Sequence, residues 1–250
     1  MSNYYHGAKA SKQATSVSTP VVADSSIHLI VGTAPVHTVG GKVNEPVYAS
    51  NYAEAVAAMG YSDEWNKYDI CEEIYSSFKL YSNGPIVMVN VLDPTKHLKG
   101  EETVDKTLAG GITELPFEAV SGTVEVKGYD GEDSLTEKYT RGEDYDLFYT
   151  DGVLRLERIE SGKIKADNAK LNIKFNSVDP SKVTKKDIIG GYDTSTNKSS
   201  GFELVDSVYP KYGVIPTLFL APNFSTDSEV AAIMAAKAEN INGLFVGKAI

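Results

Sequence analysis

The chain is poor in the residue types that usually carry covalent or metal chemistry. It has one cysteine, Cys71, and four histidines among 250 residues. A single cysteine excludes an intrachain disulfide, and Cys71 lies in a predicted helix, where a buried thiol acts as a small apolar group. The histidines show neither an i,i+4 pair nor the spacing of metal ligands: His6, His28, His37 and His97. We expect His28, inside an apolar strand, to be a satisfied core or interface histidine.

Basic clusters and long apolar runs are also missing. The formal net charge is −10 and no block of Lys or Arg occurs, so the phosphates of a nucleic acid have no partner here. The same balance argues against an anionic membrane surface. No apolar run approaches the roughly 18 residues of a membrane helix, and the N-terminus lacks a secretory signal pattern. The sequence therefore predicts no nucleic-acid partner, no membrane partner and synthesis in the cytosol.

No constellation of residues predicts catalysis. Gly40-Gly41-Lys42 is similar to a phosphate loop, but it lacks the upstream glycine and the following Ser or Thr, so a tight turn is expected. Several acidic residues could gather a calcium ion, but they lack the spacing of an EF-hand loop and are expected in solvated turns: Asp130, Glu132, Asp133, Asp144 and Asp146. We therefore expect no catalytic residue, no metal and no cofactor.

An α/β pattern begins at residue 27. Residues 27–31 form a short apolar run, typical of a strand buried on both faces, and residues 86–92 predict a second one. Between them, helices are expected after capping signals at Asn51 and Asp69, each with a Glu three residues later. The second helix is expected to bury one face: Ile70, Ile74, Phe78 and Tyr81. Strand, helices, strand predicts a β-α-β unit with neighbouring parallel strands.

The pattern changes in the middle of the chain. Short alternating segments between residues 102 and 179 predict an antiparallel β insertion, with hairpin turns at Asp130-Gly131 and Asp151-Gly152. The α/β pattern then returns. Its expected elements are a helix at 201–208, a strand at 216–221, an Ala-rich helix capped by Ser225 or Thr226, and a strand opening at 244–246.

These patterns together predict an α/β protein, α+β overall, with an open mixed sheet and helices interrupted by an antiparallel β insertion domain. The expected boundaries are an extended N-terminal arm at 1–26, a discontinuous α/β core domain at 27–100 and 183–250, and a β-rich insertion domain at 101–182.

The first residues of the chain predict a docking segment. Residues 10–26 have no helical period and few large apolar groups, so they cannot bury enough surface to fold alone. Val17, Val21 and Val22 favour a strand if a neighbour supplies the pairing edge. With Tyr5 and His6 at the start, these valines are the candidate inter-subunit residues.

Short motifs at both ends of the chain resemble contractile phage tail sheath proteins. At the N-terminus they are Tyr-His-Gly at 5–7 and a strand ending Val-Gly-Thr-Ala-Pro at 31–35. Further along they are Asp-Ile-Ile-Gly-Gly at 187–191, Gly-Phe-Glu-Leu at 201–204, and the stretches 209–216 and 220–225. Each motif is short, so the resemblance depends on their order and spacing, with a weaker match in the middle.

The resemblance implies a structural protein of a virion tail sheath, from a phage, prophage or tailocin, assembled in the bacterial cytoplasm. Such subunits form stacked sixfold rings in a helical tube around the tail tube, and the tube contracts to drive that inner tube through the host envelope. The implied partners are other copies of the chain and the tail tube protein, with the baseplate and tail terminator as further candidates. The arm at 1–26 would exchange as a strand with a neighbouring subunit, and the insertion would project outward.

The family usually continues past this point with a further α/β portion and a C-terminal arm. We therefore expect the 250 residues to be the N-terminal portion of a longer subunit, lacking most sheath–tube contacts. Alone, the chain is expected to be a monomer or weak oligomer that forms no tubes. A naturally short sheath relative is the alternative interpretation.

Two other functions stay open from the residues. An α/β enzyme or small-ligand-binding domain predicts a pocket near 32–35 or 221–224 with convergent polar groups. A surface adhesion module that uses the β insertion predicts exposed aromatic side chains there, with Tyr145, Phe148 and Tyr149 as candidates. The chain also has 15 tyrosines, a residue type suited to partly wet interfaces, and some of them are expected to contact other subunits.

Overall fold

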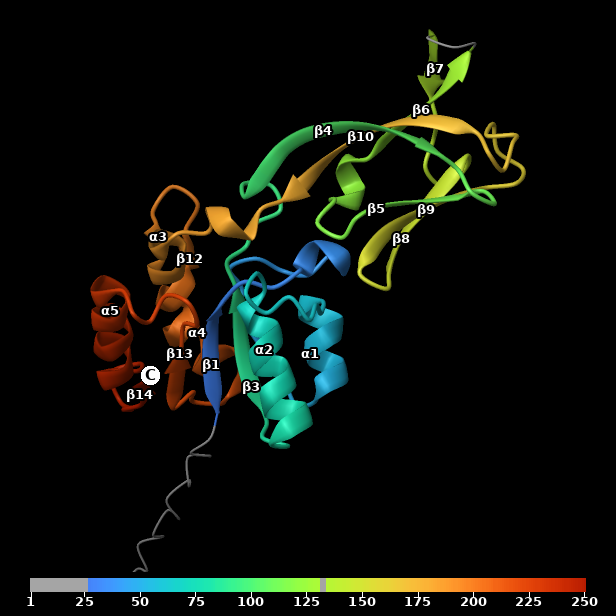
Figure 1. Cartoon of the computed structure of the whole chain (residues 1–250). Coiled ribbons are helices and arrows are strands. Elements are labelled where there is room, and N and C mark those ends of the chain that lie inside the picture. The colour runs from blue at the N-terminus through green and yellow to red at the C-terminus, as the bar shows by residue number, and fades with distance from the viewer. Residues whose placement is uncertain (1–26, 131–133) are drawn as a thin grey trace, which may run out of the picture.

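The computed structural model describes residues 27–130 and 134–250. They form an α/β core and a β-rich insertion, defined here as residues 98–178, which are joined by a narrow neck (Figure 1). The core holds a mixed sheet covered by helices, and the insertion holds separate antiparallel sheets. The predicted α/β fold class with a mixed sheet and antiparallel β structure is confirmed.

The core sheet is organised around its first strand. Its strands are β1 (His28–Gly32), β2 (Val47–Ala49), β3 (Ile86–Asn90), β13 (Leu218–Leu220) and β14 (Lys248–Ala249). The spatial order is β14-β13-β1-β3-β2, with only β2 antiparallel to its neighbour. β1 therefore pairs in parallel with β3 on one side and with β13 on the other, which confirms the predicted β-α-β unit.

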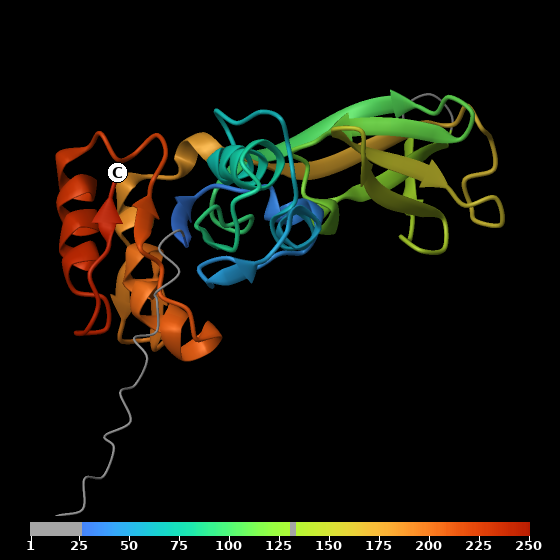
Figure 2. The ribbon, with the colours of Figure 1, turned by 90° about the horizontal axis from the view of Figure 1, so that it is seen from below.

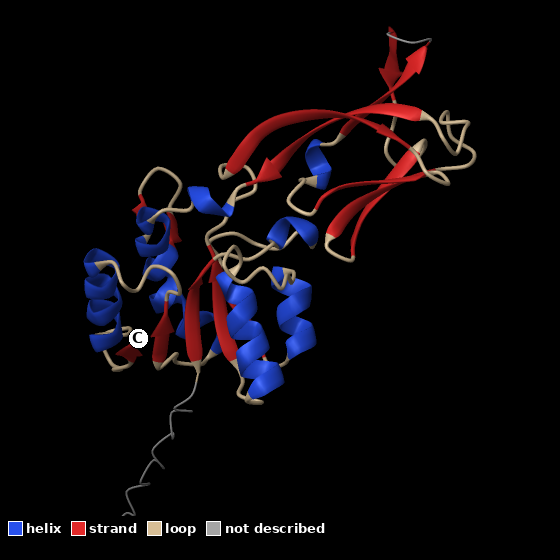
Figure 3. Cartoon of the chain, viewed as in Figure 1, coloured by secondary structure: helices blue, strands red, loops and turns tan. Residues whose placement is uncertain are grey.

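Helices cover both faces of this sheet (Figures 1 and 3). They are α1 (Tyr52–Met59), α2 (Asp69–Tyr75), α3 (Lys185–Ile189), α4 (Val205–Tyr212) and α5 (Ser228–Glu239). Ile30 packs in one apolar cluster with residues of α1 and α2, whereas Leu29 and Val31 pack in another with residues of α4 and α5. Alternate side chains of a strand point to opposite faces, so β1 is buried on both. Among the described residues, no helix is long and apolar enough to cross a membrane.

The region around α1 and α2 follows the prediction in part. Asn51 caps α1 by accepting a hydrogen bond from the Glu54 amide at 3.0 Å. Asp69, in contrast, is the first residue of α2 and no cap, so that prediction was wrong. The last turn after α2 is a π-helix, Ser76–Leu80, which rotates the following residues relative to an α-helical face. Tyr81 is consequently 76% exposed instead of packing with Ile70.

The insertion consists of two antiparallel sheets (Figure 3). One has the order β4-β10-β6-β7: β4 (Leu98–Thr107), β10 (Lys170–Val178), β6 (Glu125–Asp130) and β7 (Ser134–Lys138). The other has the order β5-β9-β8: β5 (Ile112–Pro116), β9 (Val153–Arg158) and β8 (Tyr145–Thr150). Their facing side chains, such as Val126, Leu154 and Ile173, form one apolar cluster. Figure 2 shows the insertion extending from the core on the side opposite α5.

One of the two predicted hairpin turns can be checked. Asp151 and Gly152 connect β8 to β9 with φ of 48° and 74°, the left-handed conformation that a tight hairpin requires. Gly131 of the other predicted turn lies outside the described residues. The sequence analysis also did not predict the edge strand β2 or the small hairpin of β11 (Gly191–Asp193) and β12 (Lys198–Ser200).

The C-terminal part of the core corrects two predictions. The cap of α5 is Asp227, whose side chain accepts hydrogen bonds from the amides of Glu229 and Val230, and neither Ser225 nor Thr226 takes this role. The last strand, β14, begins at Lys248 and not within 244–246. A turn at Asn242-Gly243, with φ of 53° and 72°, reverses the chain first and leaves 244–246 as a surface loop.

The corrected cap gives a stability prediction. Asp227→Ala should lower the free energy of unfolding by about 1 kcal/mol, because two amides of the first turn lose their acceptor. Thr226→Ala, one residue earlier, is the matched control and should change the free energy by less than about 0.5 kcal/mol. Urea unfolding followed by circular dichroism measures both. If Thr226→Ala lowers the free energy of unfolding more than Asp227→Ala does, Thr226 is the cap of α5.

Candidate functional site

The predicted inter-subunit residues cannot be placed in this structure. Tyr5, His6, Val17, Val21 and Val22 all lie in residues 1–26, outside the described residues. Their role in linking subunits stays a prediction, so the candidate site must be sought on the surface that would receive such a segment.

Among the described residues, β14 is an edge strand of the core sheet and pairs with β13 alone. The Lys248 amide donates to the Thr217 carbonyl at 2.8 Å, and the Ile250 amide donates to the Phe219 carbonyl at 3.2 Å. Alternate residues of a parallel strand bond to the same neighbour, so the amide and carbonyl of Ala249 face away from the sheet. An edge with unpaired backbone groups is a template for an added strand.

Exposed apolar side chains surround this edge. Leu244, Val246 and Ile250 are 79%, 73% and 69% exposed. We call these three residues the edge patch. Nearby, the ring of Tyr209 contacts that of Phe245, with centroids 5.9 Å apart, and it is also exposed. Apolar side chains gathered at an unpaired strand edge are typical of a protein interaction surface.

The opposite edge of the sheet, at β2, is in contact with the end of α4. The Pro46 carbonyl, just before β2, accepts hydrogen bonds from the Tyr212 hydroxyl at 2.6 Å and from Lys211 Nζ at 3.0 Å. Tyr48 of β2 stacks on Tyr212 with ring centroids 5.7 Å apart. Within the described residues, the end of α4 therefore binds the start of β2, whereas β14 combines outward-facing backbone groups with exposed apolar side chains.

A crevice occurs where the ligand-binding alternative expected one. It has a volume of about 320 Å³ and lies at the carboxyl ends of β1 and β13, next to Thr33 and Asn223. The chain leaves β1 toward β3 and later returns to its other side as β13, so this is the switch point of the sheet. Ligand sites of open α/β sheets are commonly found at such a point.

The buried carboxyl group of this crevice is Asp69, which is 1% exposed. Its Oδ1 accepts hydrogen bonds from the Thr33 amide at 2.6 Å and from the Thr33 hydroxyl at 3.2 Å. Burial raises the pKa of Asp69 to about 7, against the opposing effect of bonds from Thr33 and the Asn223 side chain. A titrating carboxyl group in a crevice is the feature that best favours the enzyme alternative.

The partners of these groups favour a structural role instead. Asp69 ties the start of α2 to the loop after β1 through Thr33, and Asp179 accepts hydrogen bonds from the amide and hydroxyl of Ser181. Lys67, also in the lining, turns its Nζ to Glu118 at 2.8 Å. The polar side chains of the crevice thus bind one another and hold loops together, and they do not converge on its centre.

Other groups with possible chemistry are also used structurally. His28 Nδ1 lies 2.6 Å from Glu73 Oε1, so it is a satisfied histidine, as expected. Burial raises the pKa of Cys71 to about 12, which makes it an inert apolar side chain, also as expected.

Asp144 is buried and accepts bonds from the amides of Thr140 and Lys163, so its assignment to a solvated turn was wrong. In the part of the chain that the structure describes, no His, Cys, Asp and Glu cluster could hold a metal ion.

The aromatic side chains proposed for adhesion are mostly not available. Tyr145 is buried in the insertion, and the Tyr149 hydroxyl donates to the Ala119 carbonyl at 2.6 Å and accepts from the Ser121 amide at 3.1 Å. Only Phe148 of the three is exposed, at 40%. The alternation along β8 explains the difference, because Tyr145 and Tyr149 share one face of the strand and Phe148 lies on the other.

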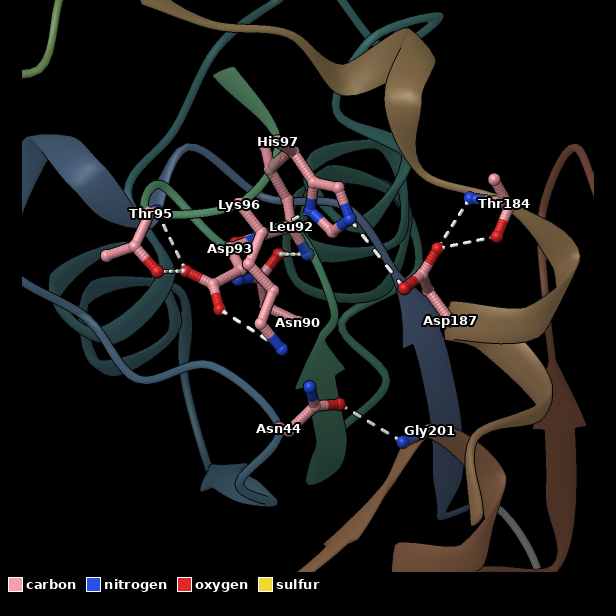
Figure 4. Close-up of polar contacts among 10 residues, drawn as sticks. All are labelled: Asn44, Asn90, Leu92, Asp93, Thr95, Lys96, His97, Thr184, Asp187 and Gly201. Atoms are coloured by element: carbon pink, nitrogen blue, oxygen red, sulfur yellow. Dashed lines mark hydrogen bonds and ion pairs between the residues drawn. The ribbon is translucent and has the colours of Figure 1, made fainter. Parts of the chain in front are cut away.

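The neck between core and insertion is built from polar contacts (Figure 4). At the end of β3, Asn90 Oδ1 accepts hydrogen bonds from the amides of Ala34 at 2.9 Å and Leu92 at 3.1 Å. His97 Nδ1 accepts from the Asp93 amide at 2.9 Å, so its proton belongs on Nε2, which lies 3.7 Å from Asp187 Oδ1. The returning chain joins here too, because the Asp179 amide donates to the His97 carbonyl.

Sequence reasoning missed the pairing of Thr33 with Asp69 and that of Tyr212 with Pro46. Both pairs join distant parts of the chain, and a helical pattern gives no information about such contacts. The only signal for Asp69 was its place at the start of a helix, which also fits an ordinary cap.

The position of Asp69 gives a pH prediction. Its pKa of about 7 in the folded state exceeds the ordinary value of 3.8, so the folded state retains a proton that the unfolded chain releases. The stability contributed by Asp69 is complete below pH 3.8 and is lost as the pH rises through about 7. The slope is at most about 1.4 kcal/mol per pH unit. The measurement is the difference in unfolding free energy between the wild type and Asp69→Asn from pH 4 to 8, and parallel curves would contradict the prediction.

Comparison with known proteins identifies a relative. The chain is 27% identical over 244 residues to the tail sheath protein of Burkholderia phage BcepMu, an alignment that covers 97% of this chain and 48% of the relative. No protein-family model matches the chain. The chain is thus a distant homologue of a phage tail sheath protein and spans about half the length of that relative. This confirms the resemblance seen in the motifs and supports a structural role in a phage tail sheath.

Proposed function

We propose that this chain belongs to a structural subunit that polymerises as a helical tube around a tail tube and contracts to drive that tube through the host envelope. The observation that carries the proposal is the alignment with a tail sheath protein over 97% of the chain. Contraction of this kind needs rearranged contacts between copies and no covalent chemistry. The use of Asp69, Cys71 and His28 in internal contacts agrees with a protein that acts by packing.

Each part of the chain has its own role in this proposal. The core domain, residues 27–100 and 183–250, supplies the rigid body that stacks in the tube. The insertion, for which we propose the domain bounds 101–182 around most of the strands at 98–178, projects outward from it. Residues 1–26 form the arm that links neighbouring subunits by adding a strand to a sheet.

The open edge at β14 is the surface on this chain that best fits an added strand. It offers the unpaired backbone groups of Ala249 and the exposed side chains of the edge patch. Main-chain hydrogen bonds would supply affinity, and apolar contacts with Leu244 and Val246 would supply register. At the β2 edge, in contrast, the Pro46 carbonyl is already occupied by Tyr212 and Lys211, so we favour β14 for strand addition.

The partners in this proposal are other copies of the chain, the tail tube protein, the baseplate and the tail terminator. The subunit assembles in the bacterial cytoplasm and resides in the virion tail. Its acidic balance, with a net charge of −10, keeps single subunits soluble before assembly.

The proposal is tested by electron microscopy of the protein made from its uninterrupted gene, beside the 250-residue chain. We expect tubes from the former and none from the latter. In the protein that forms tubes, Leu244→Asp combined with Val246→Asp should abolish them, because charges on the edge patch would be desolvated in the interface. Leu135→Asp, at an exposed position of β7, is the matched control and should leave tubes intact.

Both outcomes of this experiment can contradict the proposal. If the uninterrupted gene gives compact particles and no tubes, the sheath function is overturned. Tubes that survive the two charges on the edge patch would leave the sheath function standing but would exclude β14 as the extended edge. The same variants in the 250-residue chain should unfold like the wild type, since the substituted side chains are exposed.

A further inference from the structure

The insertion rests on the core through a small group of aromatic rings. Phe117, just after β5, has its ring centroid 5.7 Å from that of His37 and 6.1 Å from that of Tyr68, both in the core. Tyr149 of β8 approaches His37 at 5.6 Å. We call these four residues the aromatic latch. All of the contacts are edge-to-face, the arrangement that aromatic rings favour.

His37 is the titratable member of the aromatic latch. It lies in a short 3-10 turn, Val36–Thr38, and its Nε2 donates to the Phe117 carbonyl at 3.0 Å. Its Nδ1 is buried and has no hydrogen-bond partner among the described residues, and the same holds for the Tyr68 hydroxyl. A second proton on His37 would therefore sit on a buried nitrogen that has no acceptor, and burial lowers the pKa of His37 accordingly.

Charged groups beside the aromatic latch are already paired. Glu118 follows Phe117 and is the carboxylate that acts on His37, favouring its protonation. Lys67 of the core binds Glu118 at 2.8 Å and Glu64 at 2.9 Å, which offsets that attraction. Tyr149, whose ring contacts that of His37, and Tyr68, whose ring contacts that of Phe117, are the other titratable residues of the aromatic latch. Among all influences on the pKa of His37, the loss of solvation by burial is the largest.

The contact is also narrow. A cleft of about 340 Å³ lies on one side of it, between Lys99, Glu102 and Ser177, and another of about 440 Å³ lies on the other, between Asp63 and Asp151. Ser177 Oγ is buried without a hydrogen-bond partner in the described structure. Besides these rings, the ion pair of Lys67 with Glu118 and the two chain segments of the neck connect the insertion to the core (Figure 1). A small contact with unpaired polar atoms is weakly stabilised compared with a domain core.

We propose that the aromatic latch is a releasable contact that sets the angle between insertion and core, docked when His37 is neutral and released when it is protonated. Packed aromatic rings hold either a docked or an undocked arrangement and do not deform continuously, so the contact behaves as a two-state element. All of these contacts lie within this chain, so the aromatic latch does not depend on the proposed sheath function.

The direction of the pH dependence follows from the buried nitrogen. Docking is at full strength above the ordinary histidine pKa of 6.5 and weakens as the pH falls below it, because only the undocked state accepts the second proton readily. For one proton, the ratio of undocked to docked molecules rises by at most about tenfold per pH unit.

The test measures the distance between the two parts directly. Spin labels on Leu80→Cys in the core and Leu135→Cys in the insertion use exposed positions, and the buried Cys71 remains unlabelled. At pH 7.5 we expect one narrow distance distribution for the wild-type background. Phe117→Ala should shift or broaden it, whereas Phe148→Ala, the matched control on the same insertion, should not.

A pH series separates the role of His37 from simple packing. At pH 5.5 the distances seen with Phe117→Ala should appear as a second population in the wild-type background, and His37→Gln, which can still donate to the Phe117 carbonyl, should stay docked. An unchanged distribution in folded Phe117→Ala would overturn the latch. If the distance distribution of His37→Gln changes at pH 5.5 as much as that of the wild-type background, His37 does not control the aromatic latch. If circular dichroism shows that Phe117→Ala is unfolded, the pH series of the wild type and His37→Gln tests the aromatic latch without that variant. An unchanged wild-type distribution at pH 5.5 would then overturn the latch.

Discussion

The structure depends on the parallel pairing of β1 with both β3 and β13. His28 lies opposite Ile86 on one side and opposite Leu218 on the other, so five residues join segments from both ends of the described chain. Because β1 is buried on both faces, helices from before and after the insertion must cover it. The insertion can leave and return without disturbing the core because this strand already holds the two flanking segments together.

The loop that follows β1 connects the central strand to α2 and to the insertion. Thr33 binds Asp69 and so fixes the start of α2, and His37, four residues later, touches the insertion through Phe117. Gly32 is required at the end of the strand, because a Cβ there would collide with Asp69 Oδ1. The short segment after β1 thus contacts both a helix of the core and the insertion. It links the positions of these two parts to the end of the central strand.

The two edges of the core sheet differ in what lies beside them. Tyr212 and Lys211 occupy the Pro46 carbonyl beside β2, whereas Ala249 of β14 has unpaired backbone groups next to exposed apolar side chains. Proteins usually protect strand edges with charges, bulges or covering segments. In the described part of the chain, apolar side chains beside such an edge mark a surface suited to contact with another segment of polypeptide.

Elements whose signal is local could be predicted from the sequence. The apolar runs at 27–31 and 86–92, the Asn51 cap and the Asp151-Gly152 turn all appear as predicted, because each depends on neighbouring residues. The order of these elements also determined the α/β class, and short motifs in order were enough to indicate the tail sheath relative.

Tertiary structure decided everything that depends on residues meeting from distant segments. Asp69 has the sequence of a helix cap but serves as a buried partner of Thr33, and Tyr81 leaves the apolar face because a π-turn precedes it. The residues 244–246 have a strand composition, but the Asn242-Gly243 turn and the pairing of β13 with Lys248 leave them on the surface. The physical reason is common to these cases: burial and backbone pairing depend on which partner is near, and only the folded chain specifies the partner.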